Sequence, residues 1–264
     1  LFYGIYERIH SFWENSYLKA EGAPMEGELA FLRPLADKLP EGVLDGPVVM
    51  APASSERQLD RKNLRRASAM LDEAGWPVGD DGMRRNAAGE TLQVEILNDS
   101  QAFDRVINPY IENLRALGVD AVHTRIDNAQ MTERERSFNF DMVVGNFRTA
   151  LTPGSELEQY FGSESAEFSI FNLAGYGSEA VDSLIDSVTA AEDRTTLDDA
   201  TRALDRVLRA EVFWVPQWFK NTHTVAYYDM YRYPENLPPY ALGTLDFWWF
   251  DQAAHDKLKA AGAF

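Results

Sequence analysis

The most regular pattern of apolar and polar positions in this chain lies between residues 63 and 147, where the period changes from helix to strand and back. A helix places apolar residues three or four positions apart, whereas a half-buried strand alternates them with polar residues. These periods predict, in order, a helix at 63–75, a strand at 92–97, a helix at 101–117, a strand at 119–126, a short helix, and a strand at 140–147. Short connections favour parallel strands and right-handed crossovers, so the three strands are expected to share one sheet.

Glycine and proline residues mark the ends of these helices. Gly75 and Gly118 fit the left-handed conformation that terminates a helix, and Asp99 or Ser100 is placed to cap the second helix. An interior proline costs a helix about 3 kcal/mol, so Pro109 predicts a kink or a restart in that helix.

The sequence before this unit is less regular. Residues 1–20 are rich in aromatic side chains and read as the end of a helix followed by an irregular segment. Residues 21–60 are rich in Pro, Gly, Glu and Ala, which favours a surface course with short helical turns.

The sequence after the unit predicts two amphipathic helices and an aromatic-rich end. Ser178 is placed to cap a helix at 179–191, and Thr195 or Thr196 starts another that runs to about Arg209. The run VFWVPQWF (212–219) reads as a buried strand that Pro216 interrupts at an edge or crossover. A short helix is expected near the C-terminus.

Composition and charge narrow the functional classes. The net charge of −17 argues against nucleic acid and anionic membranes as partners. The chain has no cysteine, which excludes disulfides and thiolate chemistry, and no apolar run long enough to span a membrane. It begins without Met on the apolar run LFYGIYERIHSFW, so we expect it to be a fragment, and the missing signal peptide is then uninformative.

Catalytic and metal-binding patterns are absent from the sequence. The four histidines (10, 123, 223 and 255) are scattered, and no pair has the spacing of a metal site. There is no nucleophile elbow and no glycine-rich phosphate loop. We therefore expect no cofactor and no metal, and a protein that holds a ligand rather than converts one.

Aromatic residues gather near the C-terminus, including Trp214, Trp218, Trp248 and Trp249. Core packing explains most of them, because aromatic side chains bury large areas. A few are candidates to line a pocket, and Trp218 is the best of these because it follows the crossover at Pro216.

Several motifs in order identify a resemblance. AMLDEAGW, NLRALGVDAVHTRID, FDMVVGNF, FNLAGYGSEAVDSLID and VFWVPQWF resemble the C-terminal half of the family 5 extracellular solute-binding proteins, the peptide-binding components of ABC importers. YERIHSFWENSYLKAEGAP near the start and YALGTLDFWWFD near the end resemble the YejA-type branch. The resemblance implies an α/β, type II periplasmic binding protein fold. In it, a mixed β-sheet flanked by helices forms most of the second lobe, and a C-terminal segment returns to the first.

The resemblance also implies domain limits and a function. Residues 1–217 would form most of lobe II, and residues 218–264 would belong to lobe I. The expected function is periplasmic binding of oligopeptides or peptide-like compounds in an interlobe cleft, with a permease of the inner membrane as partner. Two alternatives stay open: a ligand-sensing accessory protein of a chemoreceptor or signalling system, and more remotely an α/β hydrolase.

The ligand-binding candidates are Phe147, Arg148, Thr149, Asn172 and Trp218. In the family, an Asp in the motif A-D-Y-x-x-P binds the ammonium group of the peptide. Here the run is RTALTP (148–153), and Thr149 stands where the Asp would be. We therefore predict a ligand that is N-blocked, bound in another register, or negatively charged near Arg148. We also expect residues 218–264 to pack incompletely and to allow self-association of the fragment.

Overall fold

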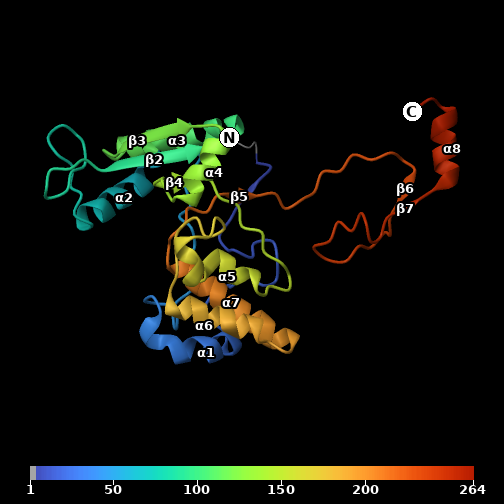
Figure 1. The fold of residues 1–264 in the computed structure, drawn as a ribbon, viewed down its shortest axis with the longest axis horizontal. Helices are drawn as coiled ribbons and strands as arrows, with labels where there is room; N and C mark the ends of the chain where they lie inside the picture. The colour runs from blue at the N-terminus through green and yellow to red at the C-terminus, as the bar shows by residue number, and fades with distance from the viewer. Residues whose placement is uncertain (1–3) are drawn as a thin grey trace.

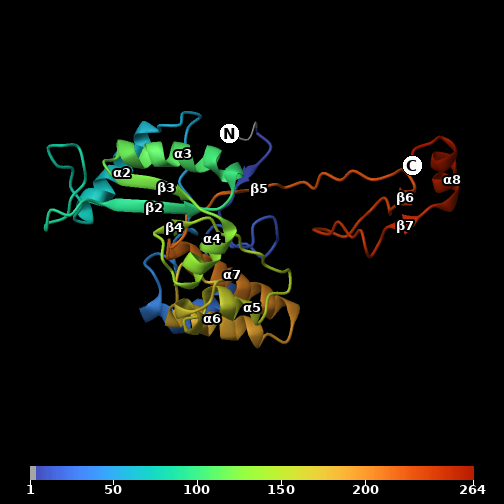
Figure 2. The same ribbon diagram turned by 45° about the horizontal axis from the view of Figure 1, so that its top comes forward.

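The computed structural model describes residues 4–264, in which two packed units are followed by an extended C-terminal tail (Figures 1 and 2). We name these the α/β unit (residues 60–143), the helical unit (residues 9–50 and 151–210) and the tail (residues 220–264). The elements are β1 (Glu7–Arg8), α1 (Glu26–Leu32), η1 (Arg33–Lys38), α2 (Arg61–Glu73), β2 (Gln93–Asn98), α3 (Gln101–Ala116), β3 (Asp120–Arg125), α4 (Asn128–Arg136), β4 (Met142–Val143), α5 (Glu156–Phe161), η2 (Glu164–Glu167), α6 (Glu179–Thr189), α7 (Arg194–Ala210), β5 (Trp218–Phe219), β6 (Tyr231–Arg232), β7 (Trp249–Phe250) and α8 (Gln252–Ala260).

The α/β unit confirms the predicted order of helices and strands. Its three strands form one parallel sheet in the order β3–β2–β4, and α3 connects β2 to β3. Ile107 and Ile111 of α3 pack against Ile96 and Ala121 of the sheet. The handedness of the connection stays a prediction.

The sheet is not mixed, which corrects one part of the expected fold. Antiparallel pairing occurs in two separate two-stranded ladders, β1–β5 and β6–β7, whose strands are two residues long and lie outside the α/β unit. Inside the α/β unit, antiparallel pairing is limited to the isolated bridges Val78–Arg84 and Arg85–Thr91, which are not strands of the three-stranded sheet. The fold class is α/β, as expected.

Two features of the helices also differ from the sequence prediction. Pro109 lies inside α3, which runs unbroken from Gln101 to Ala116. Asp193, rather than Thr195 or Thr196, caps α7, because its carboxylate accepts a hydrogen bond from Thr196 N at 3.0 Å. Short acidic side chains are as effective at this position as hydroxyls.

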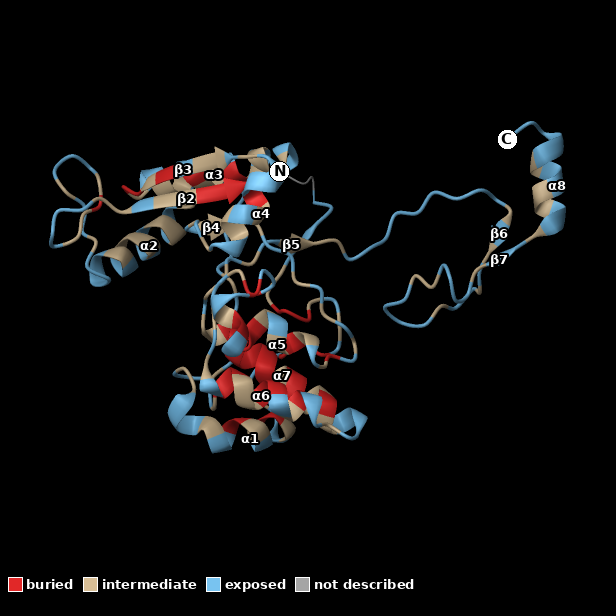
Figure 3. Cartoon of the chain, in the orientation of Figure 1, coloured by how far each residue is buried: buried red, intermediate tan, exposed pale blue. Residues whose placement is uncertain are grey.

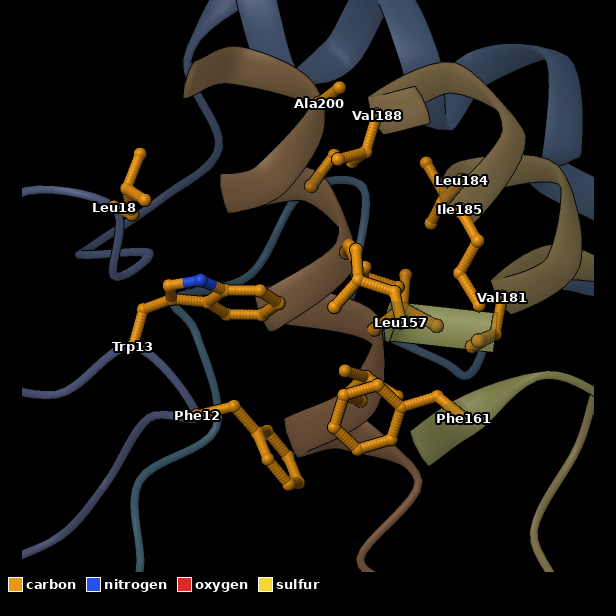
Figure 4. Close-up of a cluster of buried hydrophobic side chains, with 14 of the residues drawn as sticks. Phe12, Trp13, Leu18, Leu157, Phe161, Val181, Leu184, Ile185, Val188 and Ala200 are labelled. Atoms are coloured by element: carbon orange, nitrogen blue, oxygen red, sulfur yellow. The ribbon is translucent and has the colours of Figure 1, made fainter. Parts of the chain in front are cut away.

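The helical unit contains the main hydrophobic core. Figure 4 shows Trp13 and Phe12 facing side chains of α5, α6 and α7, and Figure 3 shows how the buried residues concentrate on these helices. Trp13 is 1% exposed, and Leu157, Leu184 and Leu204 are fully buried. The apolar stripes predicted for α6 and α7 therefore face each other.

The N-terminal segment corrects the prediction for residues 1–20, because its described part contains no helix before α1. The surface course with short helical turns expected for residues 21–60 is largely observed, since most of these residues are exposed and α1 and η1 lie among them. Residues that pack on α7 are the exception, and Leu32 and Val43 are buried in the core. Asp205 of α7 holds this segment, because its carboxylate accepts hydrogen bonds from Ser11 Oγ at 2.8 Å, Phe12 N at 2.9 Å and Ala20 N at 2.9 Å. Burial raises the pKa of Asp205, and Arg209, at 3.2 Å, opposes this rise.

A second buried ion pair fastens α1 to the same helix. Arg206 Nε and Nη2 donate to one carboxylate oxygen of Glu28 at 2.9 and 2.8 Å, and both side chains are buried. Partners this far apart in sequence give no local signal, so the sequence pattern did not predict that α1 is fastened to α7.

The chain leaves the packed units after β5 and crosses to the β6–β7 ladder and α8 (Figure 1). No residue from 211 to 264 is buried, and Leu245 is 97% exposed. This corrects the buried strand predicted at 212–219, where only Trp218 and Phe219 are paired in a strand. The tail packs incompletely, as expected, and α8 is the predicted short helix.

Candidate ligand-binding site

The carboxyl ends of β2, β3 and β4 lie at the same edge of the sheet, because the strands are parallel. Loops at this edge are where open parallel sheets bind ligands. The chain that leaves β4 here also connects the α/β unit to the helical unit. We name residues 145–150 the exit segment.

Burial alternates from residue 146 to residue 150 of the exit segment. Phe147 and Thr149 are half-buried, whereas Arg148 and Ala150 are exposed. Alternation with a period of two is typical of an extended chain. The segment therefore places one set of side chains against the protein and presents the other set to solvent.

The inward side chains are firmly held. The ring of Phe147 lies 5.1 Å from Phe12, 5.5 Å from Phe161 and 6.0 Å from Trp214, measured between ring centroids. Thr149 Oγ1 donates a hydrogen bond to Phe12 O at 2.9 Å. The hydroxyl of Thr149 thus fixes the segment, and its role as a ligand contact stays a prediction.

Arg148 is the free cation of the segment. Its side chain is exposed, and it makes no ion pair or hydrogen bond with any residue between 4 and 264. A guanidinium group carries five N–H donors in a planar fork that matches a carboxylate or phosphate. Arg148 can therefore bind an anionic group without breaking an existing contact.

The backbone of the exit segment is also unpaired. Between residues 4 and 264, no backbone–backbone hydrogen bond involves residues 145–150. These N–H and C=O groups are candidate contacts that the sequence reasoning, which considered side chains, missed. The sequence predicted a strand over residues 140–147, and the structure corrects this, because β4 covers only Met142–Val143.

The polar groups at the other strand ends are already paired. Arg125 Nη1 donates to Asp104 Oδ2 at 2.6 Å, and Asn128 Nδ2 donates to Asp99 Oδ2 at 3.2 Å. Asn98 is buried, and its Nδ2 donates to Ser100 O at 2.8 Å. The exit segment is therefore the part of this edge with donors and acceptors to spare.

Trp218 lies in β5, which joins the N-terminal strand to the chain leaving the helical unit. It pairs with Arg8 across the β1–β5 ladder. Its ring centroid is 6.3 Å from that of Tyr6 and 6.0 Å from that of Phe103 in α3. Trp218 thus lies beside the α/β unit and is half-buried, and its ligand-binding role stays a prediction.

Asn172 lies apart from the exit segment, in a loop of the helical unit. It is 1% exposed, its Nδ2 donates to Tyr176 O at 2.6 Å, and its Oδ1 accepts from Tyr176 N at 3.1 Å. These bonds close the loop before α6. A ligand-binding role for Asn172 stays a prediction. To contact a ligand, the Asn172 amide would have to give up its hydrogen bonds to Tyr176.

Two further observations limit the chemistry of the described part of the chain. Residues 4–264 contain no group of three or more His, Asp or Glu side chains placed to hold a metal ion. No helix in the same range has the length and apolar character needed to cross a membrane. The exit segment thus offers a cation and backbone hydrogen-bonding groups.

Comparison with known proteins shows the family of this chain. The model of the bacterial extracellular solute-binding proteins, family 5 Middle, matches residues 2–168. A probable peptide-binding protein YejA from Agrobacterium fabrum is 37% identical over 260 residues, which cover 97% of this chain and 42% of that protein. The uncharacterized protein YejA from Escherichia coli K12 is 32% identical over 99% of this chain and 43% of its own length.

Solved structures share the fold at low sequence identity. The oligopeptide-binding protein AppA from Bacillus subtilis, solved with a nonapeptide, is similar with a TM-score of 0.56 and 13% identity, over 94% of this chain and 52% of that one. The chain spans about two fifths of the length of the curated relatives named above.

Proposed function

Because this chain belongs to the bacterial extracellular solute-binding proteins of family 5, we propose that the whole protein is the extracytoplasmic binding component of an ABC importer. Its ligand is a peptide or peptide-like compound, held between two lobes that close about a hinge. Residues 1–217 form most of lobe II, and residues 218–264 return to lobe I. The course of the tail away from the packed units supports this division (Figure 1). The loaded protein docks on a permease in the inner membrane from the periplasmic side.

The unpaired backbone of the exit segment carries this proposal. An extended chain with free N–H and C=O groups binds the main chain of a peptide as an added strand does, whatever the peptide's side chains are. Residues 145–150 supply such a chain at the carboxyl edge of a parallel sheet. Burial of Phe147 and Thr149 against Phe12 fixes the segment before a ligand arrives, which lowers the entropy cost of binding.

Arg148 selects the chemistry of the ligand end. A buried ammonium group needs a carboxylate partner, because an unpaired buried charge is costly. The exit segment offers a guanidinium group instead, at Arg148. The ligand is therefore N-blocked, bound in another register, or anionic at the end that lies near this residue.

The whole protein binds its ligand without converting it. The direct test is native mass spectrometry of the protein purified from its host, followed by identification of the released compound. A bound peptide or peptide-like compound that is recovered intact after incubation is the expected result. Recovery of cleaved products, or of a ligand with no amide backbone, contradicts the proposal.

Calorimetry on the whole protein tests the ligand end separately. A free peptide and its N-acetylated form are expected to bind with affinities that differ by less than tenfold, about 1.4 kcal/mol. Arg148→Ala is expected to weaken binding of an anionic peptide-like ligand more than tenfold, whereas Arg66→Ala, an exposed arginine on α2, leaves it unchanged. A loss of more than tenfold on acetylation of the peptide shows an ammonium anchor and refutes this part.

A further inference from the structure

A loop of the helical unit holds three large apolar side chains in solvent. Phe168 is 68% exposed, Phe171 is 49% exposed and Ile170 is 40% exposed. They follow η2 and precede the turn that leads to α6. Single exposed apolar residues are ordinary, but a cluster of them marks an interaction site.

The backbone that carries these side chains is fixed by buried polar residues. Ser165 Oγ donates to Gly162 O at 2.8 Å, Ser169 Oγ donates to Gln159 O at 3.0 Å, and Asn172 Nδ2 donates to Tyr176 O at 2.6 Å. All three donors belong to residues that are less than 10% exposed. The loop is thus ordered before any partner binds, which reduces the entropy cost of association.

The exposed side chains also line a cavity. It lies where the loop meets α5 and the end of α4, with a volume of about 490 Å³. Its lining includes Phe168, Ile170 and Phe171, with Glu158, Glu164 and Arg136 as charged groups. The cavity has room for one or two large side chains of a partner, and such pockets are where interface hot spots insert.

The chain that forms this face is acidic, although Arg136 lines the cavity and Lys38 pairs with Glu179 of α6 at 2.6 Å. Residues 149–193 contain no Lys or Arg. The nine carboxylate side chains in this range are Glu156, Glu158, Glu164, Glu167, Glu179, Asp182, Asp186, Glu192 and Asp193. Burial raises the pKa of Glu158, and the nearby charges of Asp182, Glu164 and Asp186 raise it further. A partner that approaches this face gains electrostatic attraction if its own surface is basic.

We propose that this acidic apolar face, made by the loop at 164–172 together with α5 and α6, docks a basic protein surface whose apolar or aromatic side chain enters the cavity. Under the proposed function, on which this inference rests, that surface belongs to the membrane permease. The apolar cluster supplies most of the binding energy. The carboxylates steer the encounter and select the partner.

The test measures stimulation of permease ATPase activity by the ligand-loaded whole protein in proteoliposomes. Phe168→Ser and Glu164→Lys are each expected to raise the concentration for half-maximal stimulation at least fivefold, with unchanged ligand affinity by calorimetry. Met70→Ser and Glu73→Lys are the matched controls, because both residues are exposed on α2, and they are expected to leave stimulation unchanged.

Each other result overturns the inference. Stimulation that matches the controls shows that the permease does not use this face. A loss of ligand affinity in Phe168→Ser places the face in the ligand site instead. If Phe168→Ser lowers the melting temperature and leaves stimulation normal, the face packs against residues of the whole protein that lie beyond this chain. If calorimetry shows that the wild-type protein binds no ligand, the proposed function itself fails. This outcome is distinguished from failure of the docking proposal because it does not depend on the ATPase measurement.

Discussion

The helical unit and the tail are both rich in aromatic residues, yet they differ completely in burial. In the helical unit, Phe12 stacks on Trp214 at 4.1 Å and meets Phe161 at 5.0 Å, inside a core that Trp13 completes. In the tail, no residue from 220 to 264 is buried.

The tail's aromatic residues pack mainly on one another. Tyr227 lies 4.8 Å from Trp248, and Tyr233 lies 4.6 Å from the same ring. One ring contact, between Tyr17 and Tyr240 at 5.9 Å, joins the tail to the helical unit. The difference teaches that aromatic content alone does not place a segment in a core. Burial requires facing elements, and the helical unit supplies them through α5, α6 and α7.

The largest expected effect comes from the polar anchor of the helical unit. Asp205→Ala removes the acceptor of Phe12 N and Ala20 N and leaves Arg209 buried without its partner. Breaking a buried ion pair in this way is expected to cost about 5 kcal/mol of unfolding free energy. Urea denaturation followed by circular dichroism measures it, and a loss below 1 kcal/mol would show that the anchor is dispensable.

A matched pair of tryptophans tests the contrast directly. Trp13→Ala is expected to destabilise the protein by about 3–4 kcal/mol, because it leaves a large cavity in the core. Trp249→Ala removes a side chain that is 53% exposed and is expected to cost less than about 1 kcal/mol. Equal losses in urea denaturation would mean that the tail is packed in solution.

Two glycines of positive φ sharpen the comparison further. Gly118, with φ of +86°, ends α3, and an added Cβ would lie 2.5 Å from Gly82 O. Gly118→Ala is expected to cost about 2–3 kcal/mol, since the strained backbone and the close contact act together. Gly262 in the tail has φ of +73° and open space around its Cα, so Gly262→Ala is expected to cost about 1 kcal/mol or less. Thermal unfolding measures the melting temperatures of both variants. Similar decreases for Gly118→Ala and Gly262→Ala would contradict the expected difference between the α/β unit and the tail.

The smallest expected effect is that of removing most of the tail. A chain that ends at residue 224 keeps both hydrophobic cores, because neither contains a tail residue. Its free energy of unfolding is expected to stay within about 0.5 kcal/mol of that of the intact chain. A larger loss in urea denaturation would reveal packing between the tail and the two units.

Local periodicity was sufficient to predict the α/β unit. The strand and helix periods between residues 63 and 147 depend only on residues that are close in sequence. Elements β2, α3 and β3 therefore lie where the sequence predicts them. The contacts that fasten residues 9–50 to α7 were not predicted, because Asp205 and Arg206 bind partners about 180 to 190 positions away. No local pattern records such a contact.

The candidate site was only partly predictable for a related reason. Arg148 and Phe147 adjoin the end of a predicted strand, and the structure places them on opposite sides of the exit segment. The free backbone groups of that segment carry no side-chain signature. Asn172 was named as a ligand contact, whereas the structure uses its amide to close a loop.

Hydrogen exchange on the whole protein tests the central claim most directly. The co-purified ligand is removed by unfolding and refolding, and amide exchange is followed by mass spectrometry with and without it. The account predicts that the ligand slows exchange in peptides covering residues 145–150, because their N–H groups make no backbone hydrogen bond with any residue from 4 to 264, while α2 exchanges equally in both states. Unchanged exchange at residues 145–150 with ligand bound would contradict the account.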